Sequence, residues 1–153
     1  MTQPAERNWP DLAGRIEGKR HILPVRVYFE DTDFSGFVYH TGYLRWCERG
    51  RSDLLRLLGV HHSELAEPGE GKPPSAFVLR HMEVDYLRPA RIDDVLEVTT
   101  ELAEIGRVHL TLAQAVMRGE EILCRVRVKA VLVSLEGRPL RLPQQLTDRL
   151  KRE

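Results

Sequence analysis

Residues 22–30 carry apolar side chains at every second position near the start of the chain. The apolar positions are Leu23, Val25, Val27 and Phe29. A period of two is typical of a strand with one buried face, so this segment is predicted to be a strand. Pro24 has no N–H to donate to a neighbouring strand, which places the start of this strand at an edge of a sheet.

After the turn at residues 31–36, the pattern changes to spacings of mostly three and four residues. The stripe consists of Leu44, Cys47, Arg51, Leu54, Leu55 and Leu58. This period predicts an amphipathic helix that begins around His40 to Tyr43 and that Gly59 can close. Residues 60–75 contain the run Glu-Pro-Gly-Glu-Gly-Lys-Pro-Pro, which predicts a surface loop.

From Ala76 onward, the alternation is almost entirely that of strands. Short breaks divide it into four segments, near residues 76–88, 94–104, 107–118 and 121–136. Short connections favour antiparallel neighbours, so the strand segments are predicted to form one antiparallel sheet. The single long helix must then cover that whole sheet. The prediction is an α+β domain in which a curled antiparallel sheet of about five strands wraps around one long central helix. This arrangement is the hot-dog fold.

The composition fits one domain, since the 153 residues are 42% hydrophobic and 30% charged. We expect a flexible N-terminal arm at residues 1–20 and a single hot-dog domain at residues 21–150. Within that domain, residues 138–143 should dock on the sheet and residues 144–150 should add a helical turn. Cys47 and Cys124 stand in apolar patterns without a CxxC pair, so both are predicted to be buried free thiols.

Charge and hydropathy restrict the partners and the location. The 23 basic and 23 acidic side chains give a formal net charge of zero at pH 7, so no nucleic-acid partner is expected. The sequence shows neither a signal-peptide pattern nor a run of about 18 apolar residues. We therefore predict a cytoplasmic protein without a transmembrane segment.

The candidate chemistry lies where the first strand turns into the helix. The segment Asp31-Thr32-Asp33-Phe34-Ser35-Gly36 contains two carboxylates and a glycine that lets backbone approach a ligand closely. The first N–H groups of a helix are unpaired, so they can stabilise a carbonyl oxygen that gains negative charge. We expect the donor to be the backbone N–H of His40 or a neighbour. Asp33 would attack an acyl carbonyl carbon or activate water.

Two other interpretations of these residues remain open. Aspartates are common in turns and helix caps, so Asp31 and Asp33 could be structural. Glu30, Asp31 and Asp33 could also bind a divalent metal with His40, because oxygen ligands suit magnesium and calcium. In strand geometry, however, only Asp31 and Asp33 would share a face, so no metal or other cofactor is expected.

A resemblance to a known family extends over roughly residues 22–135. The matching motifs are Val25 to Asp33, Gly36, Val38-Tyr39-His40, Tyr43-Leu44, Glu48 to Arg51, Phe77 to Tyr86 and Pro89 to Val98. Together they resemble the signature of the 4-hydroxybenzoyl-CoA thioesterase family, and most closely its Tol-Pal-associated acyl-CoA thioesterase branch. The resemblance implies a hot-dog fold, hydrolysis of acyl-CoA thioesters, and homodimers or homotetramers with active sites at the subunit interface.

By the same resemblance, Asp33 matches the catalytic aspartate, and the amide that polarises the thioester lies at or beside His40. The His40 side chain is expected to support catalysis. The expected substrate-binding residues are Tyr39, Gly36, Thr41, Arg88 and Arg91, with the two arginines near the nucleotide. The sequence departs from many relatives at Phe34-Ser35 and Thr41-Gly42, which bears on the shape of the acyl pocket.

Other functions and residue roles also follow from the sequence. A hot-dog dehydratase would need a histidine and an acid, which His40 and Glu48 supply, although Glu48 is also placed to pair with Arg51. A non-catalytic module would bind an acyl thioester or acyl carrier protein. The alternating cations Arg125, Arg127 and Lys129 indicate either contacts with CoA phosphates or a solvated sheet face.

Overall fold

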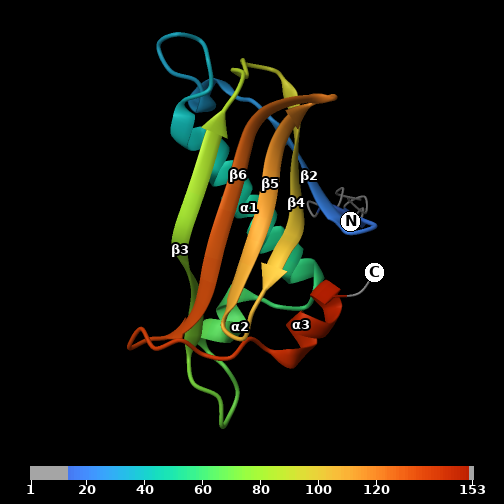
Figure 1. Ribbon diagram of the computed structural model, residues 1–153. Helices are drawn as coiled ribbons and strands as arrows, with labels where there is room; N and C mark the ends of the chain where they lie inside the picture. The colour runs from blue at the N-terminus through green and yellow to red at the C-terminus, as the bar shows by residue number, and fades with distance from the viewer. Residues whose placement is uncertain (1–13, 152–153) are drawn as a thin grey trace, which may run out of the picture.

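A computed structural model describes residues 14–151 of the chain. The long helix α1 (His40–Leu57) lies across one face of a curved antiparallel sheet, as the α+β hot-dog prediction requires (Figure 1). The strands are β1 (Arg15–Glu17), β2 (Arg20–Arg26), β3 (Ser75–Tyr86), β4 (Val95–Ile105), β5 (His109–Arg118) and β6 (Glu121–Ser134). Their order in the six-stranded sheet is β1-β2-β4-β5-β6-β3. No helix within residues 14–151 is both long enough and apolar enough to cross a membrane.

The helix α1 forms where the stripe predicts it. Its sheet-facing positions include Cys47, Arg51, Leu54 and Leu55, all of which are buried. Gly50 allows the helix to approach β4 closely, because a Cβ at this position would come within 3.2 Å of the Val98 and Thr100 side chains. The helix ends before Gly59, which has φ +85° and can adopt this conformation because it has no Cβ.

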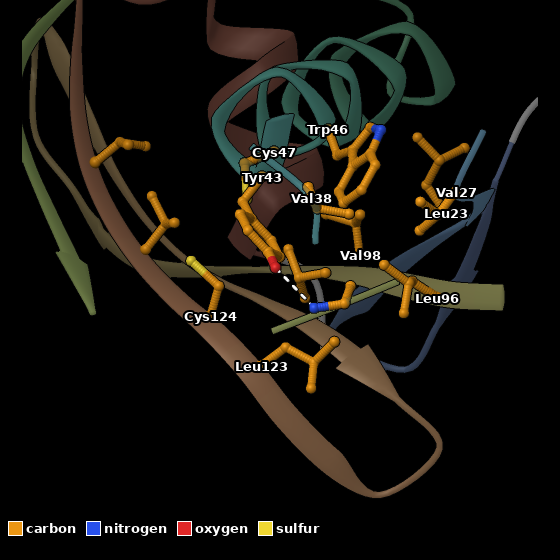
Figure 2. Close-up of a cluster of buried hydrophobic side chains, with 14 of the residues drawn as sticks. Leu23, Val27, Val38, Tyr43, Trp46, Cys47, Leu96, Val98, Leu123 and Cys124 are labelled. Carbon is orange, nitrogen blue, oxygen red and sulfur yellow. Dashed lines mark hydrogen bonds between the residues drawn. The ribbon is translucent and has the colours of Figure 1, made fainter. Parts of the chain in front are cut away.

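The main core lies between α1 and the sheet. Figure 2 shows the side chains of Tyr43 and Trp46 extending from α1 toward sheet residues such as Val98. Cys47 and Cys124 are free and buried in this cluster, as predicted. Burial raises the pKa of Cys47 to about 12 and that of Cys124 to about 11, so both remain protonated thiols at neutral pH.

The first predicted strand is wrong at its C-terminal end. Strand β2 stops at Arg26, and residues Phe29–Asp31 form a single 3-10 turn. The Phe29 side chain, which the alternation assigns to the buried face, is 81% exposed. The physical reason is local, because the Asp31 carboxylate accepts a hydrogen bond from the Tyr28 N–H at 2.8 Å and turns the chain.

Two further segments differ from the predictions. Within the predicted arm, β1 pairs with the start of β2 around a turn at Gly18, which has φ +63°. Residues 1–13 of that arm lie outside the described residues. Within the predicted loop, the short helix α2 (His62–Ala66) forms. The C-terminal predictions are confirmed, because Leu140 donates its N–H to the Leu132 carbonyl on the sheet, and α3 (Gln144–Lys151) follows.

Candidate active site

The segment between β2 and α1 folds into a small hairpin. Thr32 and Val38 pair as an antiparallel bridge, and the Asp33 N–H donates to the Phe37 carbonyl at 2.9 Å. Gly36 closes the turn with φ +84° and donates its N–H to the Asp33 carbonyl at 3.0 Å. A Cβ at Gly36 would meet no atom within 4 Å, so the turn geometry, rather than crowding, requires glycine here.

The Asp33 side chain is exposed and held at the base of this turn. Its Oδ1 accepts hydrogen bonds from the Ser35 hydroxyl and from the Ser35 N–H, the latter at 2.8 Å. These bonds lower the pKa of Asp33, and the nearby His40 adds a smaller effect in the same direction. The carboxylate is therefore ionised at neutral pH, as a nucleophile or general base must be.

Asp31 has a different role from Asp33. It is buried, its Oδ2 accepts the Tyr28 N–H, and its Oδ1 lies 3.7 Å from Nη2 of Arg45. The structural interpretation is thus confirmed for Asp31, and the expectation that Asp31 and Asp33 share a face is wrong. The 3-10 turn rotates one carboxylate inward and leaves the other outside. Within residues 14–151, no three metal-ligating side chains gather closely enough to hold an ion.

The start of α1 supplies backbone donors beside this turn. Tyr39 is the extended N-cap residue, and its own N–H donates to the Asp31 carbonyl at 2.9 Å. His40 and Thr41 begin the helix, so their N–H groups have no acceptor within it. No side chain caps this end, which leaves the positive end of the helix dipole at a solvent-exposed position.

Two tyrosines hold the helix start in place. Tyr86, from the end of β3, donates its hydroxyl to the His40 carbonyl at 2.8 Å. Tyr43 accepts the N–H of the fully buried Ala90 at 2.9 Å, the dashed line in Figure 2. The Ala90 carbonyl in turn accepts the Val38 N–H at 2.9 Å. The loop after β3 is therefore bonded both to α1 and to the segment that leads into it.

The sequence alone did not assign this role to the two tyrosines. Tyr43 could have been found from its position, one turn after His40 on the buried face of the helix. Tyr86 is harder to identify from the sequence, because its hydrogen bond depends on where β3 ends.

Around the helix start, the His40 ring lies 4.3 Å from the Tyr39 ring and 6.3 Å from the Tyr86 ring, centroid to centroid. These three rings form an exposed aromatic wall beside the free amides.

The remaining predicted binding residues are only partly brought together. The Arg91 guanidinium lies 4.8 Å from the centroid of the Phe37 ring, so it stands against the hairpin. Arg88 is bonded instead to Glu121, with 2.7 Å between Nη1 and Oε2. Thr41 is exposed in the first turn of α1.

The charged residues Glu48, Arg51, Arg125 and Arg127 also have observed positions. Arg51 does not pair with Glu48, which is exposed; it is buried and donates to Gln114 Oε1 at 2.8 Å. Arg125 and Arg127 alternate with buried valines, so they lie on the face of the sheet opposite α1.

Comparisons with known proteins agree with this fold. The model of the thioesterase-like superfamily matches residues 27–150. The acyl-CoA thioester hydrolase YbgC of Escherichia coli O6:H1 is 37% identical over 130 residues, covering 84% of this chain and 93% of that protein. The acyl-CoA thioesterase YbgC of Haemophilus influenzae is 37% identical over 125 residues, covering 81% and 89%. The crystal structure of a probable thioesterase from Bartonella henselae superposes with a TM-score of 0.77 at 41% identity, covering 81% and 99%.

Proposed function

Because this chain belongs to the thioesterase-like superfamily, we propose that it hydrolyses acyl-CoA thioesters to a free acid and CoA. The observation that carries the proposal is a carboxylate beside the unpaired N–H groups at the start of a helix. The exposed, ionised carboxylate of Asp33 belongs to the hairpin that leads directly into α1, and His40 opens that helix with unpaired amides. A nucleophile or base beside an oxyanion donor is what acyl transfer requires.

The reaction would proceed by one of two routes. In the first, Asp33 takes a proton from water while the water oxygen bonds to the thioester carbon, and the C–S bond then breaks. In the second, the Asp33 carboxylate itself bonds to that carbon, the thiolate leaves, and water hydrolyses the resulting anhydride. In both routes, the His40 or Thr41 N–H stabilises the negative oxygen, and the departing sulfur takes up a proton.

Substrate contacts form the next part of the proposal. Tyr39, His40, Gly36 and Thr41 surround the thioester, with the His40 ring supporting the reacting groups. Arg91, held against Phe37, is the better placed of the two arginines for the nucleotide side of CoA, because Arg88 already pairs with Glu121. No cofactor is needed beyond the CoA of the substrate.

The dehydratase reading is less well supported. His40 and Glu48 are eight residues apart on α1, a separation of about 12 Å along the helix axis. Glu48 is also exposed. Neither position favours shuttling a proton between the two groups.

The finer assignments are also part of the proposal. We place the chain in the Tol-Pal-associated branch of the 4-hydroxybenzoyl-CoA thioesterase family, in the cytoplasm, as a homodimer or homotetramer with active sites at subunit interfaces. The edge strand β3 supports assembly, because Val78 and Leu79 are 45% and 48% exposed there. Acyl carrier protein is a second possible carrier of the acyl group.

Thiol release from short, long and aromatic acyl-CoAs tests the proposal. A thiol-reactive dye would follow the wild type, Asp33→Asn and the matched control Asp85→Asn, which changes an exposed aspartate on β3. Release by the wild type and by the control, but not by Asp33→Asn, is the expected result. Binding of acyl-CoA without thiol release from any substrate would contradict hydrolysis, and a changed double bond in an intact thioester would indicate dehydration.

A further inference from the structure

A second hollow lies between the outer edge of β2 and the exposed side of α1. We call it the β2–α1 groove; it has a volume of about 630 Å³. Arg49, Ser52 and Arg56 line it from α1, and His62 lines it from the segment that follows. Its size falls within the usual range for small-molecule sites, roughly 300–1,000 Å³. Neither Asp33 nor any of its proposed substrate contacts lines this groove, so it is separate from the candidate active site.

The charges in the β2–α1 groove favour an anion. Arg49 and Arg56 are seven residues apart and therefore point the same way, about 10 Å apart along the helix axis. Both are exposed, and within residues 14–151 no carboxylate lies at ion-pair distance from either guanidinium. Two guanidinium groups at this spacing can contact an extended phosphate chain at both of its ends. Each guanidinium can donate two parallel hydrogen bonds to phosphate oxygens.

The carboxylate in the lining is already engaged. Asp53 Oδ2 accepts the Gly14 N–H at 2.7 Å and lies 2.7 Å from Nε2 of the buried His21. The two arginines therefore remain the dominant charges facing the opening. Ser52 Oγ lies 3.2 Å from His62 Nε2, which adds a hydroxyl and an imidazole as further polar contacts.

One wall of the β2–α1 groove is apolar. Val25 of β2 is partly exposed there, and the buried side chains of Leu23 and Val60 form the floor beside it. A ligand with an apolar ring beside a phosphate chain would contact both walls. We propose that the β2–α1 groove binds a nucleotide, with Arg49 and Arg56 on its diphosphate and the base against Leu23, Val25 and Val60.

The nucleotide diphosphate could belong to a free nucleotide or to a second CoA molecule, because the CoA whose thioester is hydrolysed has its nucleotide near Arg91. The proposal goes beyond thioester hydrolysis and does not depend on Asp33. Calorimetric titration of the full chain with ADP tests it, using the wild type, the Arg49→Gln/Arg56→Gln double variant, and an Arg107→Gln/Arg138→Gln control. The control removes two arginines that are also exposed but do not line the β2–α1 groove.

Saturable ADP binding that weakens at least tenfold in Arg49→Gln/Arg56→Gln, but not in the control, supports the proposal. Adenosine should not compete, because it lacks phosphate. No saturable binding to the wild type, or equal weakening in both double variants, would overturn it. If CoA displaces ADP, the occupant is the nucleotide part of CoA; if it does not, the occupant is a free nucleotide. Asp33→Asn should bind ADP like the wild type, so a failure of the hydrolysis proposal would be seen separately, as absent thiol release.

Discussion

The first turn and the middle of α1 differ in how their polar groups are satisfied. At the first turn, the N–H groups of His40 and Thr41 face outward without an acceptor in the helix, beside the exposed Asp33. Eleven residues after His40, the buried Arg51 donates to Gln114 at 2.8 Å. Gln114 in turn donates to the Cys47 carbonyl at 2.8 Å and to Thr100 Oγ1 at 2.9 Å.

Under the proposed mechanism, this difference separates function from stability along one helix. Unpaired amides at the helix start are available to a substrate, whereas a buried polar group without a partner would destabilise the fold. Substitutions near Asp33 should therefore change turnover with little effect on folding. Substitutions around Gln114 should do the reverse.

The largest effect is expected from the aspartate pair at the start of the helix. Asp33→Asn should lower kcat by about 100- to 10,000-fold, because it removes the nucleophile or base. Asp31→Asn should instead lower the free energy of unfolding by about 1 kcal/mol, since its carboxylate bonds the Tyr28 N–H. Thiol-release kinetics and urea denaturation of both variants measure this contrast. Similar activity losses in the two variants would contradict the separation.

In the middle of the helix, Gln114→Leu should lower the free energy of unfolding by about 1–3 kcal/mol. The reason is that it leaves the buried Arg51 guanidinium without its acceptor. Burial already lowers the pKa of Arg51, so a lost partner makes its charge harder to accommodate. Urea denaturation would compare it with Arg127→Gln on the exposed sheet face. An unchanged unfolding midpoint would show that the network contributes nothing.

Tyr86→Phe should have a smaller effect, on turnover rather than on stability. It removes the hydrogen bond to the His40 carbonyl, and with it about 0.5–1.5 kcal/mol of positional restraint on the helix start. We expect kcat to fall by roughly two- to tenfold with KM little changed. Tyr28→Phe removes an exposed hydroxyl from the same end of the molecule as a control. Equal kinetics for the two variants would count against this role.

Ser35→Ala should give the smallest effect, a shift in the pH dependence of kcat/KM. The Ser35 hydroxyl lowers the pKa of Asp33, and the active form is the ionised carboxylate, so activity is lost as pH falls through that pKa. Without the hydroxyl, the pKa rises toward its ordinary value, and the acid limb should move to higher pH. Thiol-release rates across the acid range measure the shift; a limb that stays in place would exclude Asp33 as its source.

Much of the fold could be predicted from the sequence because periodicity reports burial directly. The stripe that ends near Leu58 and the four strands after Ala76 follow this rule. The prediction that Phe29 is buried was wrong, because the hydrogen bond to the Asp31 carboxylate turns the chain and ends the strand alternation. The 3-10 turn also explains why spacing alone could not separate Asp31 from Asp33.

The candidate site was predictable to a similar extent. The position of Asp33 before a helix start follows from the sequence, because both lie in one continuous segment. The support from Tyr86 and Ala90 does not, since it depends on where a distant strand ends. The groove between β2 and α1 likewise joins residues far apart in the chain, which no spacing rule connects.

The two edges of the sheet are unequal. On one side, β1 pairs with β2 only as far as Ile22. Beyond that point, Pro24 has no N–H to donate to an added strand. On the other side, the outer edge of the twelve-residue strand β3 pairs with no other strand among residues 14–151. Strand addition is therefore open at one edge and obstructed at the other. If a second copy pairs through its own β3, the open edges of both chains become paired. Strand addition then stops at a closed dimer instead of continuing into a fibre.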